Sequence, residues 1–150
     1  MNKILIATDG SSASAEAVDF GLELVAEHNA EAIFVHVAPQ FEAVPMTGFP
    51  GTGAVPHDLT DEDRAPLEGA ADAAAARHVA ATTALLVGNS ADEIVAYADK
   101  LDVDLIVIGS RGHGAVLNAL LGSVSRAVVG GSKRPVVIVR GAAAKAAAAA

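Results

Sequence analysis

Five short apolar runs, separated by longer segments, constrain the fold of this chain more than any other feature. Each run is rich in β-branched residues, and such continuous apolarity is typical of strands that are covered on both faces of a parallel sheet. The runs occupy residues 3–8, 30–38, 81–88, 103–109 and 134–140. Helical spacing or helix-starting signals occur in the segments 11–29, 61–80, 89–102 and 122–131.

Strands that alternate with helices predict an α/β fold, in which a parallel sheet carries helices on both faces. Because crossovers between parallel strands are right-handed, we expect a doubly wound sheet with the five strands in the order 3-2-1-4-5. Ligands bind such sheets beyond the carboxyl ends of the strands, at the point where the order reverses. The ends of the first and fourth strands should therefore lie side by side at that point.

The segment at residues 39–60 has no clean period and is rich in proline and glycine, so we expect a long irregular loop there. Loops of this length in small domains are usually lids or disordered segments. The first helix has Ser11 or Ser12 as its candidate cap, and the third helix has Asn89 or Ser90.

The composition indicates a single soluble domain, which we assign to residues 1–140 of the 150. Residues 141–150 are low in complexity, and we expect a disordered or vector-derived tail. The lack of cysteine excludes disulfides and thiolate metal sites, and it fits a cytoplasmic protein. We expect no signal peptide and no membrane association, because no apolar run is long enough. A net charge of −8 disfavours nucleic acid as a partner.

Two strand ends carry residues that suit a phosphate-bearing ligand. Asp9 follows the first strand and Gly109 ends the fourth, so both should face the same crevice. Gly109 keeps a side chain out of that crevice, and Gly112 lets backbone N–H groups approach an anion closely. Gly122 and Ser123 start the last helix, whose N-terminal N–H groups favour phosphate.

The spacing of these glycines resembles the nucleotide-binding signature of the universal stress protein family, in its ATP-binding, UspA-like branch. The matching residues are Gly109, Gly112, Gly122 and Ser123. The stretches KILIATDGSSASAEAV and LLGSVSRAVVGGSKRPVVIV also look like that family, and the resemblance covers about residues 2–140. It implies a five-stranded α/β fold like that of the adenine nucleotide alpha-hydrolases.

The same resemblance implies a stress-response protein that binds ATP with Mg²⁺ and acts by binding rather than by fast turnover. AMP and cyclic AMP are the alternative ligands, and slow ATP hydrolysis is the alternative activity. Asp9 would contact the ribose and phosphates or the Mg²⁺, and the Val37 backbone would bind the adenine. A homodimer would form by antiparallel pairing of the last strand, at Val136–Val139. The residues implied to surround the nucleotide are Ala7, Thr8, Asp9, Val37, Gly109, Arg111, Gly112, Gly122, Ser123, Val124 and Ser125.

Other interpretations of these residues stay open. Asp9 and Gly10 are a common turn pair, and Ser123 and Ser125 also suit helix caps. The sequence has neither a P-loop nor a G-x-S-x-G nucleophile turn, so we assign no catalytic residue. A flavodoxin-like carrier is disfavoured, because its phosphate loop should follow the first strand. A phospho-receiver is disfavoured, because glycines rather than an aspartate end the third and fourth strands.

Overall fold

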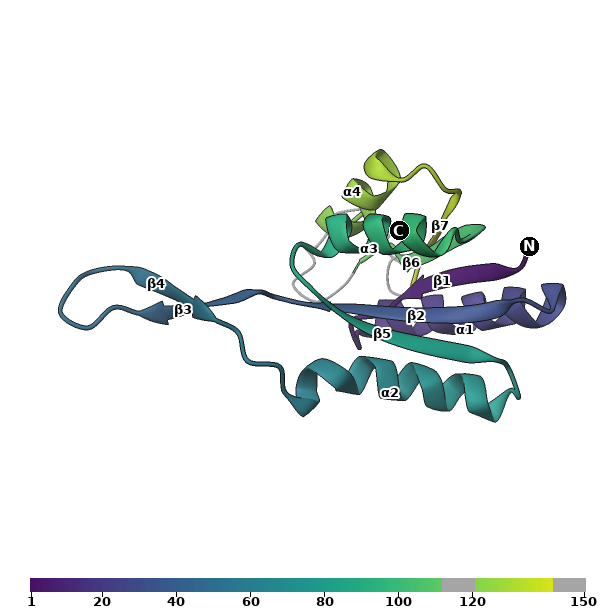
Figure 1. Ribbon diagram of the computed structural model, residues 1–150, viewed down its shortest axis with the longest axis horizontal. Helices are drawn as coiled ribbons and strands as arrows, with labels where there is room; N and C mark the ends of the chain where they lie inside the picture. Colours follow the sequence, from purple (N-terminus) through teal and green to yellow (C-terminus); the bar gives the residue numbers. More distant parts are fainter. Residues whose placement is uncertain (112–120, 142–150) are drawn as a thin grey trace, which may run out of the picture.

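The central sheet holds five parallel strands in the predicted order. In the computed structural model, which describes residues 1–111 and 121–141, β1 lies between β2 and β6, while β5 and β7 form the edges (Figure 1). The strands are β1 (Lys3–Ala7), β2 (Glu31–Ala38), β5 (Ala81–Val87), β6 (Leu105–Gly109) and β7 (Val136–Val139). The doubly wound α/β fold expected from the alternation of strands and helices is therefore confirmed.

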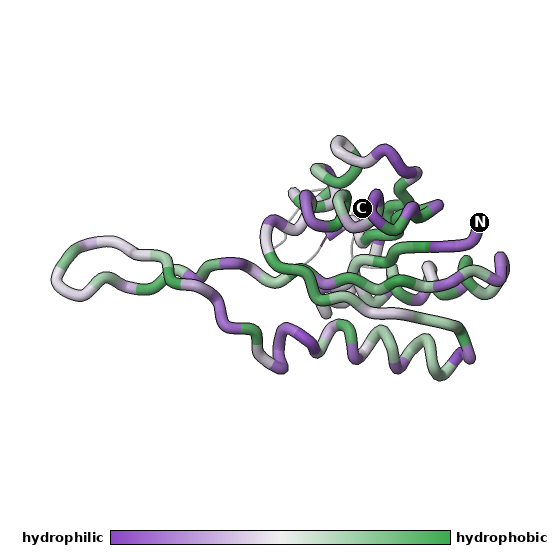
Figure 2. The backbone as a smooth tube through the Cα atoms, viewed as in Figure 1, coloured by the Kyte–Doolittle hydropathy of each residue, from purple (hydrophilic) through white to green (hydrophobic). Residues whose placement is uncertain are grey.

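The strand β1 is the centre of the sheet because it pairs with a buried strand on each side. Ile4 is in register with Ala32 of β2 and with Leu105 of β6. All three side chains are buried. The continuous apolar character of these runs reflects this cover on both faces, as in other parallel sheets. Figure 2 shows these strands as hydrophobic segments at the centre of the molecule.

The described residues place two helices on each face of the sheet (Figure 1). The pair α1 (Ser12–His28) and α2 (Asp61–Ala76) covers one face, and the pair α3 (Ser90–Leu101) and α4 (Ser123–Gly131) covers the other. The sheet thus separates two apolar cores, whose buried residues are aliphatic apart from Phe34 in the core under α1 and α2. Within the described part of the chain, no helix combines the length and apolarity needed to cross a membrane.

The helix ends follow local sequence signals. Ser11 caps α1 and Asn89 caps α3, so at each start the first of the two candidate residues is the cap. The helix α2 stops at Ala76 instead of continuing to residue 80. It stops because His78 has a left-handed backbone with a φ of 55°, and the N–H of Val79 bonds back into the last helical turn.

The segment between β2 and α2 is a β-hairpin, which corrects the prediction of an irregular loop at residues 39–60. The strands β3 (Phe41–Pro45) and β4 (Thr52–Pro56) pair antiparallel, and the hairpin extends away from the sheet and its helices (Figure 1). We call residues 41–56 the arm. Most of its residues are exposed, so neither face of the arm packs on a core. The sequence therefore lacks the alternation of apolar and polar residues that marks a half-buried strand.

Candidate functional site

The carboxyl ends of β1 and β6 lie side by side, at the point where the strand order reverses. The register pairs Ile6 of β1 with Val107 of β6, so the loops that follow both strands leave the same edge of the sheet. Thr8 and Asp9 follow β1, and Ser110 follows β6. The structure thus brings together the two strand ends that the sequence singled out, in the position where doubly wound sheets bind ligands.

The loop after β1 is held rigidly at the start of α1. The Oδ1 atom of Asp9 accepts a hydrogen bond from the Ser11 backbone N–H at 2.9 Å. The hydroxyls of Thr8 and Ser14 lie 3.3 Å apart, and the N–H of Thr8 still bonds to β2. Gly10 takes a φ of 81°, which permits the tight turn. The carboxylate of Asp9 is consequently fixed beside the N-terminus of α1.

The second strand supports this loop from the side opposite β6. The Nδ1 atom of His36 lies 2.8 Å from the backbone oxygen of Thr8. Val37 follows in β2, two residues beyond Val35, which is the partner of Ala7 in β1. The predicted adenine contact at Val37 therefore lies past the end of β1, where its backbone borders the same edge of the sheet. Ala7 itself is buried in the core.

The start of α4 is tied to the end of β6 through Ser110. The Gly122 N–H donates to the Ser110 backbone oxygen at 2.6 Å, and the buried Ser125 hydroxyl lies 3.1 Å from the same oxygen. Ser125 thus anchors the helix to the strand end. Ser123 and Val124, in contrast, are exposed in the first turn of α4. The hydroxyls of Ser123 and Ser125, which were both predicted to lie near the nucleotide, therefore occupy different environments.

The absence of a side chain at Gly109 is required by close packing against α1, and not only by the need to keep the crevice open. A Cβ atom added to Gly109 would lie 3.0 Å from the Ala13 backbone oxygen and 3.2 Å from its carbonyl carbon. Both atoms belong to the first turn of α1, so they cannot move aside by a side-chain rotation. Gly109 therefore lets α1 approach β6 closely, which carries the Asp9 loop up to the end of β6.

Within the described residues, three buried side-chain polar atoms at the ends of β6 and β7 have no hydrogen-bond partner. They are the Ser110 hydroxyl, Nε of Arg111 and Nη2 of Arg140. The residues are neighbours, because the Ser110 N–H bonds to the backbone oxygen of Val139, directly before Arg140. Buried polar groups are nearly always paired, so a cluster of unpaired ones is expected where a ligand supplies the partner. Two of the three carry positive charge, which suits an anion.

The sequence places Arg140 in a small basic group with Lys133 and Arg134, but among the basic residues only Arg111 was assigned to the predicted site. A usable signal was present, since Arg140 comes directly after the last apolar run and must leave the sheet at the same edge as Arg111. The predicted Gly112, and His113 beside it, lie outside the described residues. Within residues 1–111 and 121–141, no group of three His, Cys, Asp or Glu side chains is arranged to hold a metal ion.

Comparison with known proteins identifies relatives along nearly the whole chain. The sequence model of the universal stress protein family matches residues 1–140. Universal stress protein YxiE of Bacillus subtilis is 39% identical over 147 residues, which cover 93% of this chain and 99% of that protein. Universal stress protein MJ0531 of Methanocaldococcus jannaschii is 33% identical, with 92% of this chain and 81% of that protein covered.

Solved structures agree with the fold. A universal stress protein in complex with cAMP superposes with a TM-score of 0.69 at 29% identity, covering 92% of this chain and 95% of that one. The universal stress protein from Archaeoglobus fulgidus in complex with dAMP gives a TM-score of 0.68 at 26% identity, covering 93% and 97% of the two chains. The sequence match, the strand order and these superpositions lead to one conclusion: the chain belongs to the universal stress protein family.

Proposed function

We propose that this protein binds ATP at the carboxyl ends of β1, β6 and β7, and that it acts in the stress response through this binding. The observation that carries the proposal is the cluster of unpaired buried atoms on Ser110, Arg111 and Arg140. A phosphate chain offers the acceptors that these groups lack, and guanidinium groups bind phosphate oxygens well. The adjacent N-terminus of α4 adds N–H donors and a partial positive charge.

Relatives support an adenine nucleotide as the ligand. Two universal stress proteins of this fold were solved in complex with cAMP and with dAMP. The base would lie against the end of β2 at Val37, and the phosphates would extend toward β6 and β7. We favour ATP over AMP or cyclic AMP because two arginines at the strand ends suit more than one phosphate charge.

The residues present also fit a Mg²⁺ ion that enters with the nucleotide. Mg²⁺ is usually held by one or two carboxylates together with substrate phosphates. Asp9 would supply such a carboxylate, because it is fixed at the site by its bond from the Ser11 N–H. When bound, the ion would neutralise phosphate charge. The protein residues hold and orient the nucleotide, and we propose no residue as a catalytic base, so hydrolysis would be slow at most.

We further propose that the protein is cytoplasmic and forms a homodimer through β7. The strand β7 is an edge of the sheet, and its residues Val136–Val139 are apolar and only half buried. Unpaired apolar edges favour pairing with another strand. A second copy would supply the same edge in antiparallel orientation, which closes a symmetric dimer.

Isothermal titration of ATP into the Arg140→Gln variant tests the nucleotide site. Losing a charged hydrogen bond costs about 1.5–3 kcal/mol, so ATP should bind about 10- to 100-fold more weakly. Cyclic AMP, which carries one phosphate charge, should lose less affinity. Lys133→Gln is the matched control, because Lys133 is an exposed cation that should leave ATP affinity unchanged.

Two outcomes would contradict the proposal. The proposed function fails if the wild-type protein binds no adenine nucleotide at millimolar concentration. The placement of the phosphates fails if Arg140→Gln and Lys133→Gln bind ATP equally well. Release of inorganic phosphate in a single turnover separates binding from catalysis, and a rate typical of enzymes, about 1 per second or more, would favour an ATPase.

A further inference from the structure

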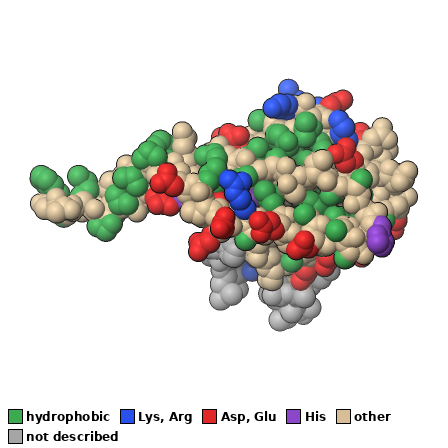
Figure 3. Space-filling view, turned by 60° about the horizontal axis from the view of Figure 1, so that its bottom comes forward, with side chains coloured by type: hydrophobic (Ala, Val, Ile, Leu, Met, Phe, Trp, Pro, Cys, Tyr) green, Lys and Arg blue, Asp and Glu red, His purple; other side chains and the backbone are tan. Residues whose placement is uncertain are grey.

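The arm carries a group of large apolar side chains that nothing in the described chain covers. Phe49 is 70% exposed, Phe41 55% and Met46 48%. Figure 3 shows hydrophobic side chains along a protrusion that stands clear of the rest of the molecule. An isolated two-stranded hairpin is marginally stable in water, so the arm would gain from packing on a partner. Exposed apolar patches of this kind usually mark interaction surfaces.

The edges of the arm are unsuited to pairing with another strand. Pro45 ends β3 and Pro56 ends β4, and neither residue has an N–H to donate. At the base of the arm, the His57 N–H bonds to the Gln40 oxygen, and near its tip the Met46 N–H bonds to the Gly51 oxygen. By the alternation of antiparallel pairs, both prolines fall on outward-facing positions. The arm is therefore built to contact a partner through its side chains rather than through edge pairing.

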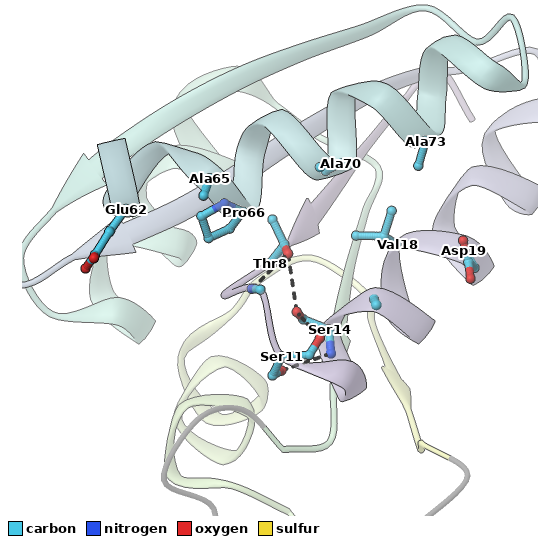
Figure 4. Close-up of a pocket in the computed structure, with 13 residues that line it drawn as sticks. Thr8, Ser11, Ser14, Val18, Asp19, Glu62, Ala65, Pro66, Ala70 and Ala73 are labelled. Carbon is cyan, nitrogen blue, oxygen red and sulfur yellow. Dashed lines mark hydrogen bonds between the residues drawn. The ribbon is translucent and has the colours of Figure 1, made fainter. Parts of the chain in front are cut away.

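The same chain offers a groove of matching chemistry between α1 and α2. Its volume is about 580 Å³, within the range of binding pockets. The lining is formed largely by small apolar residues, and Figure 4 shows them on facing sides of the groove. Examples are Ala15 and Val18 from α1, and Ala65, Ala70 and Ala73 from α2.

Gly69 of α2 also lines this groove, and a Cβ atom added there would meet nothing within 4 Å. Glycine inside a helix is unfavourable unless the space above it is needed. Packing within the described chain does not require a glycine at this position. The open space above Gly69 is thus consistent with a groove that receives another molecule.

We infer that the arm of one copy of this chain lies in the α1–α2 groove of a second copy, and that the two copies exchange arms symmetrically. The lengths agree: the five residues of β3 span about 17 Å, and the groove from Glu62 to Ala73 is about 16 Å long. The arm of each copy points away from its own body (Figure 1), so its tip reaches a neighbour instead of its own groove.

Charge limits where on the surface two copies can meet. Two copies with a formal charge of −8 each repel one another, so they associate best where acidic side chains are few. The arm has one acidic residue, Glu42, and its carboxylate contacts His57. The groove carries Glu62 and Asp19 at its rim, and the one carboxylate that the arm brings near them is already paired with His57.

The arm exchange and the β7 pairing proposed above use different regions. The helix α2 packs on β2 and β5, at the edge of the sheet opposite β7. Both contacts can therefore form in one assembly, and each is symmetric on its own. The groove does not include Ser110, Arg111 or Arg140, but one end of it is lined by Thr8, Gly10 and Ser11 of the loop after β1 and by Ser14 of α1. An arm seated in the groove would therefore lie next to the side of the nucleotide site that carries Asp9.

Sedimentation velocity of two variants tests the exchange. The arm variant carries Met46→Ser and Phe49→Ser, and the groove variant carries Gly69→Leu, which fills the groove with a helix-favouring residue. Each variant alone should have half the mass of the wild-type assembly, or associate at least tenfold more weakly. Mixing the two should restore part of the association, because an intact arm then meets an intact groove. Arm-to-arm packing would not be rescued by mixing.

Matched controls are Val129→Ser, an exposed apolar residue on α4, and Glu68→Leu, an exposed residue of α2 outside the groove. Both should keep the wild-type mass. Melting temperatures check that all variants are folded. The inference is overturned if the wild-type protein is a monomer, if the arm and groove variants keep its mass, or if the mixture shows no gain.

Discussion

Replacing Gly109 by alanine should destabilise the protein and weaken nucleotide binding together. The added Cβ atom would lie 3.0 Å from the Ala13 oxygen, 3.2 Å from the Ala13 carbonyl carbon and 3.3 Å from the Arg111 oxygen. All three are backbone atoms, so relief requires that α1 or the loop after β6 shift. The backbone of Gly109 is not in the left-handed region, and the effect is therefore steric alone.

The magnitude follows from two opposing contributions. Overpacking a buried position costs about 1–3 kcal/mol, and the lower chain entropy of alanine in the unfolded state returns about 0.4–1 kcal/mol. The net loss is about 1–2 kcal/mol. For a domain of this size, this corresponds to a decrease in Tm of roughly 2–8 °C. The shift of α1 would also displace the Asp9 loop, so ATP affinity should fall as well.

Thermal unfolding followed by circular dichroism measures the first effect, and ATP titration measures the second. Gly130→Ala is the matched control: this glycine lies in α4, and an added Cβ would meet nothing within 4 Å. That substitution should raise Tm slightly, because alanine is the better helix former. A Gly109→Ala protein with unchanged or higher Tm would refute the close approach of α1 to β6.

Three further predictions concern single residues. Hydrogen bonds to Asp63 and then to Glu42 raise the pKa of His57 above its usual 6.5. The stabilisation from this contact is complete below pH 6.5 and is lost as the pH rises through the raised pKa. His57→Gln should therefore flatten the dependence of Tm on pH between about pH 6 and 8. Ser125→Ala should lower the free energy of unfolding by about 1 kcal/mol in urea titrations, because the Ser110 oxygen loses a donor. Gly10→Ala should cost about 1–2 kcal/mol in the same assay, because Gly10 has a φ of 81°.

Most of the fold could be predicted because its strands are buried on both faces. A continuous apolar run such as residues 103–109 has one plausible environment in a small α/β domain, and the order of runs then fixes the topology. The hairpin of the arm could not be predicted, because its strands are exposed on both faces instead of buried. Its strands face solvent on both sides, so residues 41–56 carry no periodic signal that distinguishes a hairpin from a loop.

The location of the site could be predicted from the sequence, but the contacts within it could not. The strand ends at Asp9 and Gly109 follow from topology alone, and the register confirms that they share one edge. The clash that makes Gly109 necessary involves Ala13, a residue distant in sequence, and no local pattern reports such a contact. The position of Arg140 directly after the last apolar run was a usable signal, but its proximity to Ser110 becomes visible only once β6 and β7 are paired.

Ser110 explains why ligand binding and stability should be coupled at this site. Its backbone N–H bonds to β7, and its backbone oxygen accepts bonds from the start of α4 through Gly122 and Ser125. The backbone of Ser110 is thus fully used by the scaffold, while its hydroxyl is buried and unpaired. The donors for the proposed phosphate are consequently held in place before it binds, which would lower the entropic cost of binding. A substitution that loosens α4 at Ser125 should therefore weaken ATP binding as well as stability.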